Sequence, residues 1–441
     1  MYEELTKYIG KLKPGIWEDN PRSGDGSPEH PFIPPDIVYD KEVRSFTNAV
    51  FKAITFDISD YMGILERYFK TENINFNTID ISNIPGDIIL VMFFTIIRRE
   101  RFCDGLISAF IENGMFDKWL LRLKEIDEQS KTNLPNSTPT HSMLSILLGT
   151  AVGDALGMPF EFMQGGTFRC TGMAEYGTHH QPKGTWSDDT SLTLCLADAI
   201  GDGFTIGRLA DNCLSWMQDA KYTAGGNVFD IGWTTRSALS KIADGEDPLT
   251  AGGSGERTNG NGSLMRIAPL ALYTRDMDIG QRYELCRQVS SITHRHIVSV
   301  TACFILIELL RNITLGQDKA TAYRNVINET MPYLNKITDN ETMAKFDRLP
   351  TITTLNNNEL KSGGYVIETI EASMWCFMNT QCYADAVLSA VNLGHDTDTT
   401  AAVTGAVAGL YYGTEGIPTE WIRDLKNKEL IESIAKKWDD K

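Results

Sequence analysis

Over residues 396–410 the chain reads Asp396-Thr397-Asp398-Thr399-Thr400-Ala401-Ala402-Val403-Thr404-Gly405-Ala406-Val407-Ala408-Gly409-Leu410. Two acids are followed by a long helix-like run of small and apolar residues, a composition typical of a helix at a crowded helix–helix interface. Residues 187–190, Ser-Asp-Asp-Thr, open a second apolar run about two hundred residues earlier. Strand signals are few and scattered. The sequence therefore predicts an all-α fold for this part of the chain.

The two acidic clusters suggest a metal site. Hard divalent cations bind oxygen ligands from several carboxylates and hydroxyls, and two clusters at two helix starts can fold onto one another. Each cluster taken alone has a simpler interpretation, because Ser, Asp and Thr are favoured at helix N-termini. The spacing in 396–399 excludes an EF-hand, since neither a third acid nor a terminal Glu follows at the required distance.

Two further motifs lie in the same region. Residues 143–161 hold Gly149, Gly153 and Gly157 at every fourth position, which gives a helix a smooth face for close packing, and carry Asp154 and Glu161. Residues 258–266, Thr-Asn-Gly-Asn-Gly-Ser-Leu-Met-Arg, form a loop whose backbone N–H groups could hold phosphate oxygens. A packed core helix and an ordinary turn are the competing interpretations of these two motifs.

Composition limits the class of protein. The 441 residues predict two or three domains. A formal charge of −17 argues against a sequence-independent nucleic-acid surface and against binding to anionic membranes. The eight cysteines form no CxxC pair, the first residues are acidic without a signal-peptide core, and the longest apolar stretches, 88–97 and 297–310, are shorter than a membrane span. We expect a cytoplasmic protein with reduced thiols.

The chain divides by composition. Six prolines between residues 14 and 35 predict an extended arm. Helical periodicity follows, so residues 1–127 are predicted to form a mostly helical accessory module behind this arm. Residues 128–141 are polar and contain two prolines, as a linker would. Residues 142–441 then form the domain that carries all four motifs.

Taken together and in this order, the motifs resemble those of the ADP-ribosylglycohydrolase family, the group that includes dinitrogenase-reductase-activating glycohydrolase. The resemblance covers about Met143 to Tyr412 and consists of GDALGxPFE, GxWSDDT, NGNGSLMR, a Thr-His pair and DTDTTAA. It implies an all-α, orthogonal helical bundle with a binuclear metal site, here preceded by a smaller, mostly helical N-terminal module.

The resemblance also implies roles for individual residues. Two Mg²⁺ or Mn²⁺ ions are expected, because the ligands are hard oxygens, and Asp398 is expected to bridge them. Glu161 is implied as general base or substrate gate, and is grouped with Asp398 and Asp189 as catalytic. The implied metal ligands are Ser187, Asp188, Asp189, Asp396, Asp398 and Thr399. The implied substrate-binding group comprises Asp154, Gly260, Ser263, Leu264, Met265 and His294, and Asp154 is also expected to support the metal cluster.

The implied activity is metal-dependent removal of ADP-ribose from modified protein side chains, with arginine as the favoured linkage. The expected partners are an ADP-ribosylated protein and ADP-ribose, with no nucleic acid and no membrane. One alternative is an immunity protein that neutralises a cognate ADP-ribosyltransferase toxin by binding its active site as well as by hydrolysis. Another is an enzyme that acts on small ADP-ribose conjugates.

Overall fold

The computed structural model describes residues 2–19, 34–54, 58, 60–69, 71, 74–82, 84–132 and 142–439. The chain forms two compact units, Met1–Asn136 and Ser137–Lys441. Both are helical, and among the described residues the only strands are the two of one small antiparallel pair. The all-α class and the helical character of the N-terminal module are thereby confirmed.

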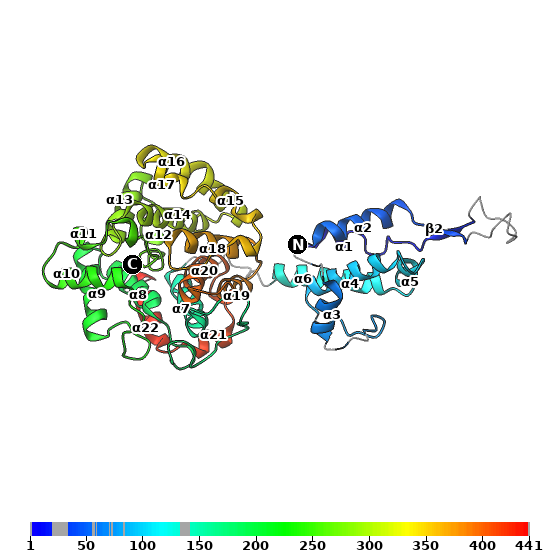
Figure 1. Cartoon of the computed structure of the whole chain (residues 1–441), viewed down its shortest axis with the longest axis horizontal. Coiled ribbons are helices and arrows are strands. Elements are labelled where there is room, and N and C mark those ends of the chain that lie inside the picture. Colours follow the sequence, from blue (N-terminus) through cyan, green and yellow to red (C-terminus); the bar gives the residue numbers. More distant parts are fainter. Residues whose placement is uncertain are drawn as a thin grey trace. The chain divides into compact units, whose positions relative to one another are not determined.

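The N-terminal unit (Figure 1) has a hydrophobic core of its own, which contains a cluster of aromatic rings among aliphatic side chains. Phe93 lies at its centre, with ring centroids 5.2 Å from Phe46, 5.0 Å from Phe116 and 5.1 Å from Trp119. Edge-to-face pairs at such distances stabilise a core beyond the area that they bury. The helices are α1 (Glu3–Thr6), α2 (Lys41–Ala53), α3 (Tyr61–Phe69), α4 (Gly86–Arg99), α5 (Leu106–Glu112) and α6 (Met115–Thr132).

The proline-rich arm is more regular than predicted where it is described. Strand β1 (Ile16–Glu18) pairs antiparallel with β2 (Asp36–Val38), with Trp17 opposite Ile37. The arm prediction missed this pairing because the two strands are short and depend on each other across the intervening prolines. Residues 20–33 lie outside the described residues. Helix α6 continues to Thr132, past the predicted start of the linker at 128, and residues 133–141 lie outside the described residues as well.

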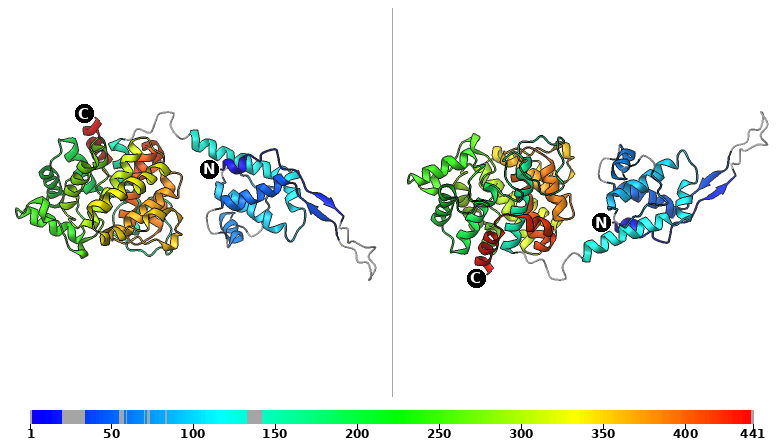
Figure 2. Two further views of the ribbon diagram at one scale, coloured as in Figure 1. Left: turned by 90° about the horizontal axis from the view of Figure 1, so that it is seen from above. Right: turned by 90° about the horizontal axis from the view of Figure 1, so that it is seen from below.

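Two helices form the centre of the larger unit. Figures 1 and 2 show α7 and α20 side by side, and α8, α18 and α19 pack against them. The α-helices of this unit are α7 (Met143–Gly157), α8 (Asp188–Gly201), α9 (Ile206–Asp219), α10 (Trp233–Ala243), α11 (Pro248–Ala251), α12 (Leu270–Tyr273), α13 (Ile279–Ser291), α14 (Ile297–Thr314), α15 (Lys319–Asn325), α16 (Met331–Ile337), α17 (Asn340–Ala344), α18 (Val366–Met378), α19 (Tyr383–Asn392), α20 (Thr397–Tyr412), α21 (Thr419–Asp424) and α22 (Lys428–Asp439). A π-helical turn, η3 (Val326–Thr330), joins α15 to α16, and short 3₁₀ turns are η1 (Met158–Phe160), η2 (Glu256–Thr258), η4 (Leu349–Thr354), η5 (Asn357–Glu359) and η6 (Thr414–Gly416).

The glycine stripe of α7 brings these two central helices into backbone contact. A Cβ atom added to Gly149 would lie 2.2 Å from the carbonyl oxygen of Gly405, and one added to Gly153 would lie 2.1 Å from that of Ala401. At Gly157 the nearest atom would be the carbonyl oxygen of Thr397, at 2.4 Å. The contacts run in opposite directions along the two helices, so α7 and α20 are antiparallel and only glycine permits their approach.

Two segments of this unit are long and apolar enough to cross a membrane by composition, Met143–Phe160 and Ile297–Thr314. The second segment, Ile297–Thr314, is longer than the apolar stretch 297–310 that the sequence indicated. Both are 89% buried inside the unit. A helix that is apolar on all sides is expected in the core of a large helical domain.

Candidate active site

The close approach of α7 and α20 determines where the second acidic cluster lies. The side chain of Thr397, the first residue of α20, donates a hydrogen bond of 2.7 Å to the carbonyl oxygen of Gly157 at the end of α7. Asp398 and Thr399 follow directly and are buried. The start of α20 is therefore fixed to the end of α7, next to the turn that leads to Glu161.

Asp154 connects α7 to the first acidic cluster. Its carboxylate accepts hydrogen bonds from the backbone N–H of Ser187 (2.9 Å) and of Thr190 (3.0 Å), and from the Thr190 hydroxyl (2.6 Å). Its side chain is completely buried, which raises the pKa of Asp154 to about 6. Asp154 thus holds the start of α8, as a support of the metal cluster would, and its part in substrate binding stays a prediction.

The two acidic clusters, distant in sequence, meet in one site. The Thr399 hydroxyl lies 3.3 Å from Oδ2 of Asp189, and the Ser187 hydroxyl lies 3.1 Å from the same oxygen. Glu161, Asp396 and Asp398 each offer a carboxylate oxygen within 4.8 Å of the others. The predicted meeting of the clusters is thus seen in the fold. Which of these oxygens bind metal stays a prediction.

The electrostatics of this acid cluster fit a cation. Burial raises the pKa of Asp188, Asp189 and Asp398 well above the usual range, and neighbouring carboxylates raise it further. Oδ1 of Asp189 and Oδ2 of Asp398 are buried without a hydrogen-bond partner. Within residues 142–439 no lysine or arginine forms an ion pair with these three acids. Buried carboxylates without a counter-charge are costly, and a divalent cation with oxygen ligands would compensate them.

A second group of side chains extends the site beyond the predicted residues. Nε2 of His179 forms a very short contact with Oε2 of Glu161 and lies 3.8 Å from Oδ1 of Asp230. The His179 ring lies near the rings of Phe162 and Phe229, with centroid distances of 6.0 and 5.5 Å. These contacts fix the direction of the Glu161 side chain, which is only 5% exposed.

The pKa values of this group follow from its surroundings. Burial, together with the charge of Glu161, raises the pKa of Asp230 to about 7. Burial also raises the pKa of Glu161, and the hydrogen bond to Glu161 raises that of His179. Carboxyl groups whose pKa lies near neutrality are suited to accept and return a proton.

The sequence analysis missed His179 and Asp230. His179 is one of only seven histidines and precedes the acidic motif at 187–190 by a few residues. Its position in the sequence could therefore have indicated that it belongs to the site. Asp230 carried no comparable signal, because it lies in an irregular loop. It adopts a φ of 57°, a left-handed conformation that no local pattern indicated.

The loop of residues 258–266 borders the acid cluster. Nδ2 of Asn261 donates a hydrogen bond of 2.9 Å to Oδ2 of Asp396. Among the described residues, the backbone N–H groups of Gly262, Ser263 and Leu264 have no hydrogen-bond acceptor. Successive free N–H groups of this kind form an anion-binding surface.

For the predicted substrate-binding residues of this loop, the side chain and the backbone differ in whether they could contact a ligand. Leu264 and Met265 have buried side chains, and the Ser263 hydroxyl lies 3.4 Å from Sγ of Cys303 and accepts a hydrogen bond from Ser290. Their side chains are therefore part of the core, and only their backbone atoms could contact a ligand. Gly260 is half-buried and lies between the buried residues Asn259 and Asn261.

The His294 ring packs against the loop of residues 258–266 at Gly260 and Gly262. A Cβ added to Gly262 would lie 2.8 Å from the His294 ring, and one added to Gly260 would lie 3.5 Å from it. The ring is buried, and burial lowers the pKa of His294 to about 3, so the imidazole is neutral. Arg266 fixes the same loop by donating to the carbonyl oxygen of Gly262 at 2.6 Å.

Both units of the chain match known protein families. Residues 136–440 match the family described as ADP-ribosylglycohydrolase, and residues 2–129 match a family of unknown function (DUF6508). An ADP-ribosylarginine hydrolase Tri1 from Pseudomonas putida is 33% identical over 66% of this chain and 75% of its own length. An ADP-ribosyl-[dinitrogen reductase] glycohydrolase from Rhodospirillum rubrum is 27% identical over 65% of this chain and 90% of its own length.

A solved structure shares the fold of the larger unit. It is described as an ADP-ribosylglycohydrolase-related protein complex and superimposes with a TM-score of 0.56 at 33% identity, over 67% of this chain and 95% of its own. Since the family match extends over more than half of the chain, the protein belongs to the ADP-ribosylglycohydrolase family, is a hydrolase of that type, and carries an additional N-terminal module.

Proposed function

We propose that this enzyme removes ADP-ribose from the arginine side chains of modified proteins and requires two divalent cations, Mg²⁺ or Mn²⁺. The observation that carries the proposal is the acid cluster, in which buried oxygens of Asp189 and Asp398 lack a partner. The arginine linkage is supported by two relatives named ADP-ribosylarginine hydrolase, which are 33% and 31% identical to this chain.

The ligands of the two cations would be those at the starts of α8 and α20. We assign them to Ser187, Asp188, Asp189, Asp396, Asp398 and Thr399. Bound cations of this type would orient the ribose hydroxyls next to the scissile bond and lower the pKa of a nearby water. Asp154 would keep the start of α8 in place through its hydrogen bonds to Ser187 and Thr190.

The rest of the ligand would lie along the loop of residues 258–266. The free N–H groups of Gly262, Ser263 and Leu264 would donate hydrogen bonds to the diphosphate oxygens. The neutral His294 ring beneath Gly260 and Gly262 would keep the loop in this conformation. ADP-ribose would then extend from this loop to the acid cluster. The hydrogen bond from Asn261 to Asp396 already connects the loop to this cluster.

Hydrolysis requires one proton to be moved, and we assign this transfer to Glu161. Water would supply the oxygen of a new bond to the anomeric carbon and pass its proton to the Glu161 carboxylate. The bond from this carbon to the guanidinium nitrogen would break, and Glu161 would return the proton to that nitrogen. His179 would hold Glu161 in position, since its ring contacts Oε2 of Glu161. Nearby carboxylates would stabilise the positive charge that develops on the sugar ring.

The test is release of ADP-ribose from an arginine-ADP-ribosylated protein, measured with Mg²⁺ or Mn²⁺ and again after EDTA. We expect release with metal, none with EDTA, and none from Asp398→Ala with either. Free ADP-ribosyl-arginine should be measured in parallel, because equal rates on free and protein-bound substrate would favour an enzyme of small conjugates. Release that continues in EDTA would refute the metal requirement.

An additional toxin-neutralising role is the alternative proposal. It is supported by β1, on which Ile16 and Trp17 are 70% and 51% exposed, since exposed apolar residues on a short strand are common in protein contacts. If this surface blocks a cognate ADP-ribosyltransferase toxin, Ile16→Asp would weaken inhibition of the toxin while Asp398→Ala would leave it unchanged. Equal inhibition by a chain that begins at residue 141 would contradict the role.

We also propose a cytoplasmic location. Eight free cysteines support it, six of them buried, because such thiols persist in reducing compartments. Fractionation of cells that express the full-length chain would test this, and recovery in an oxidising compartment would refute it.

A further inference from the structure

We propose that the aromatic ring of Phe162 binds the guanidinium group of the modified arginine and thereby selects arginine-linked substrates. The inference rests on the proposed function and names the part of the substrate that this ring recognises. Phe162 directly follows Glu161, to which the proton transfer at the guanidinium nitrogen is assigned. Phe162 is 70% exposed, whereas Glu161 is only 5% exposed. An open aromatic ring therefore adjoins a buried acid in the chain.

The backbone around Phe162 fixes the position of this ring. Phe162 adopts a φ of 63°, a left-handed conformation that is rare for a bulky side chain. Its N–H donates a hydrogen bond of 2.6 Å to the carbonyl oxygen of His395, and the Thr178 hydroxyl donates one of 2.7 Å to the carbonyl oxygen of Glu161. Single exposed apolar residues are common on protein surfaces. Backbone strain of this kind, in contrast, persists where the surrounding structure imposes it, and it is concentrated at ligand sites.

The ring borders the acids that surround the scissile bond. Its centroid lies 6.0 Å from that of His179, whose Nε2 contacts Glu161 and lies 3.8 Å from Oδ1 of Asp230. The two ring planes are inclined by 55°, so the imidazole does not stack on the phenyl face. In the described part of the chain, no lysine or arginine lies over this face either. The face is therefore open to a ligand that reaches Glu161.

The charges around the ring favour a cation as this ligand. Within the described residues, His179 is the one basic side chain that pairs with Glu161 or Asp230. The net charge of the chain, −17, adds to the attraction for a positive group. A guanidinium is planar and positively charged, stacks on aromatic faces and donates hydrogen bonds to carboxylates. It is therefore complementary both to the Phe162 face and to the neighbouring acids.

Adenine, the other planar group of the substrate, is less suited to this place. The diphosphate separates adenine from the ribose that carries the scissile bond, and we assign the diphosphate to the loop of residues 258–266. Glu161 is assigned to the scissile bond itself, where the next atom beyond the anomeric carbon is a guanidinium nitrogen. The ring that adjoins Glu161 would thus meet the arginine side of the substrate.

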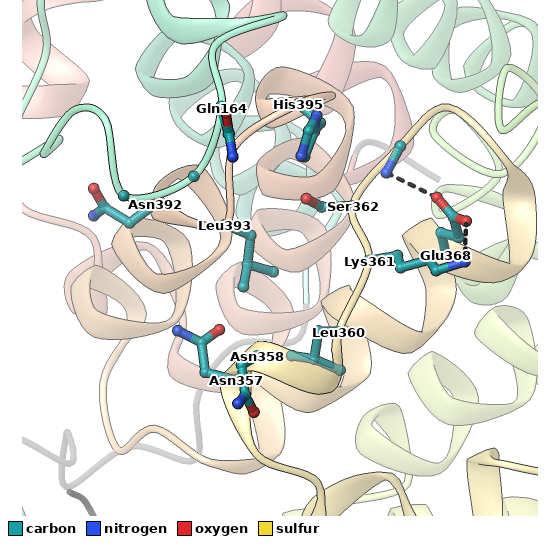
Figure 3. A pocket seen from close by; sticks show the side chains of 13 residues that line it. Gln164, Asn357, Asn358, Leu360, Lys361, Ser362, Glu368, Asn392, Leu393 and His395 are labelled. Atoms are coloured by element: carbon teal, nitrogen blue, oxygen red, sulfur yellow. Dashed lines mark hydrogen bonds and ion pairs between the residues drawn. The ribbon is translucent and has the colours of Figure 1, made fainter.

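The arginine side chain also has open space next to this ring. The N–H of His395 donates a hydrogen bond of 2.7 Å to the carbonyl oxygen of Met163, the residue after Phe162. His395 and Gln164 both line a cavity of about 490 Å³, seen from close by in Figure 3. The modified protein could therefore stay attached through this space while the guanidinium lies on the Phe162 ring.

The experiment measures two constants for each variant of the full chain. One is KM for an arginine-ADP-ribosylated peptide, and the other is the inhibition constant of free ADP-ribose, which lacks the guanidinium. In Phe162→Leu, KM should rise about threefold to tenfold, because the cation–π contact is lost. The inhibition constant and kcat should stay within about twofold, since the contact is made equally in the ground state and the transition state. Phe162→Tyr and Phe162→Trp keep an aromatic face, so their KM should stay within about twofold of that of the unaltered enzyme.

Phe102→Leu is the matched control, because it removes another exposed phenylalanine ring, 91% exposed, from the N-terminal unit. It should leave both constants unchanged. An unaltered inhibition constant in Phe162→Leu also shows that this variant keeps its fold and its ADP-ribose site.

Three results would overturn the inference while the proposed function stands: an unchanged KM in Phe162→Leu, an equal rise in the inhibition constant of ADP-ribose, or equal losses in the leucine and tyrosine variants. A fall in kcat alone would also overturn it, because the ring would then act by positioning Glu161. If the unaltered enzyme with Mg²⁺ or Mn²⁺ hydrolyses neither the modified peptide nor an arginine-ADP-ribosylated protein, the proposed function fails, and the inference with it.

Discussion

Replacing Gly153 by alanine should both destabilise the larger unit and damage the active site. The new Cβ would lie 2.1 Å from the carbonyl oxygen of Ala401, whereas ordinary contacts of this kind begin at 3.4 Å. Helices α7 and α20 would have to separate locally by about 1.3 Å. Overpacking of this kind costs about 1–3 kcal/mol, and each kcal/mol lowers the Tm of a domain of this size by roughly 2–4 °C. We therefore expect a fall of about 2–12 °C.

The same movement would shift the start of α20, where Asp398 and Thr399 lie, away from the start of α8. A misplacement of about 1 Å can reduce catalysis by about a hundredfold. Thermal unfolding of the full chain, followed by circular dichroism, and the release of ADP-ribose at several Mn²⁺ concentrations measure the two effects. Loss of activity that excess Mn²⁺ partly restores would show that the metal ligands have moved apart.

Gly207→Ala is the matched control for this prediction. Gly207 lies in the first turn of α9, and an added Cβ would meet no atom within 4 Å. Here alanine should leave activity unchanged and raise stability by up to about 1 kcal/mol, because glycine costs more backbone entropy than alanine in a helix. An unchanged Tm in Gly153→Ala, or equal losses in both variants, would refute the argument that backbone contact requires glycine in α7.

Three further predictions concern the acid cluster and its supports. Asp398→Asn should abolish the rise in Tm that Mn²⁺ or Mg²⁺ causes in the unaltered protein, because ligands that bind only the folded state stabilise it; an undiminished rise would remove Asp398 from the ligand set. His179→Ala should lower kcat about tenfold to a hundredfold with little change in KM, and His179→Gln, which keeps a donor toward Glu161, should restore part of kcat; equal losses in both variants would contradict a positioning role. The folded pKa of Asp230, about 7, lies above its ordinary value of 3.8, so the folded state binds more protons and this group lowers stability progressively as pH rises from about 4 to 7. In EDTA the Tm of Asp230→Asn should therefore exceed that of the unaltered chain by an amount that grows as the pH rises across this range. A difference in Tm that does not change with pH would contradict this predicted direction.

The sequence by itself determined the helical class and the positions of the acidic motifs. Periodicity and composition are local properties, so the small-residue run of α20 and the glycine stripe of α7 were visible before any contact was known. The stripe is explained by the fold, because Gly149 and Gly153 each contact the backbone of the opposite helix. The short strands β1 and β2 were missed, since neither forms without the other.

Only the tertiary structure decided how these parts work together. It bonded Asp154 to the start of α8 and brought His179 and Asp230 to Glu161. It also formed a cavity to which the segments 164–166, 357–368 and 392–395 contribute. None of these arrangements follows from local patterns, because each depends on loop conformations such as the positive φ of Asp230 and on hydrogen bonds between residues far apart in sequence. Local preference selects the helices, whereas the burial of charged and polar groups between them decides which side chains meet.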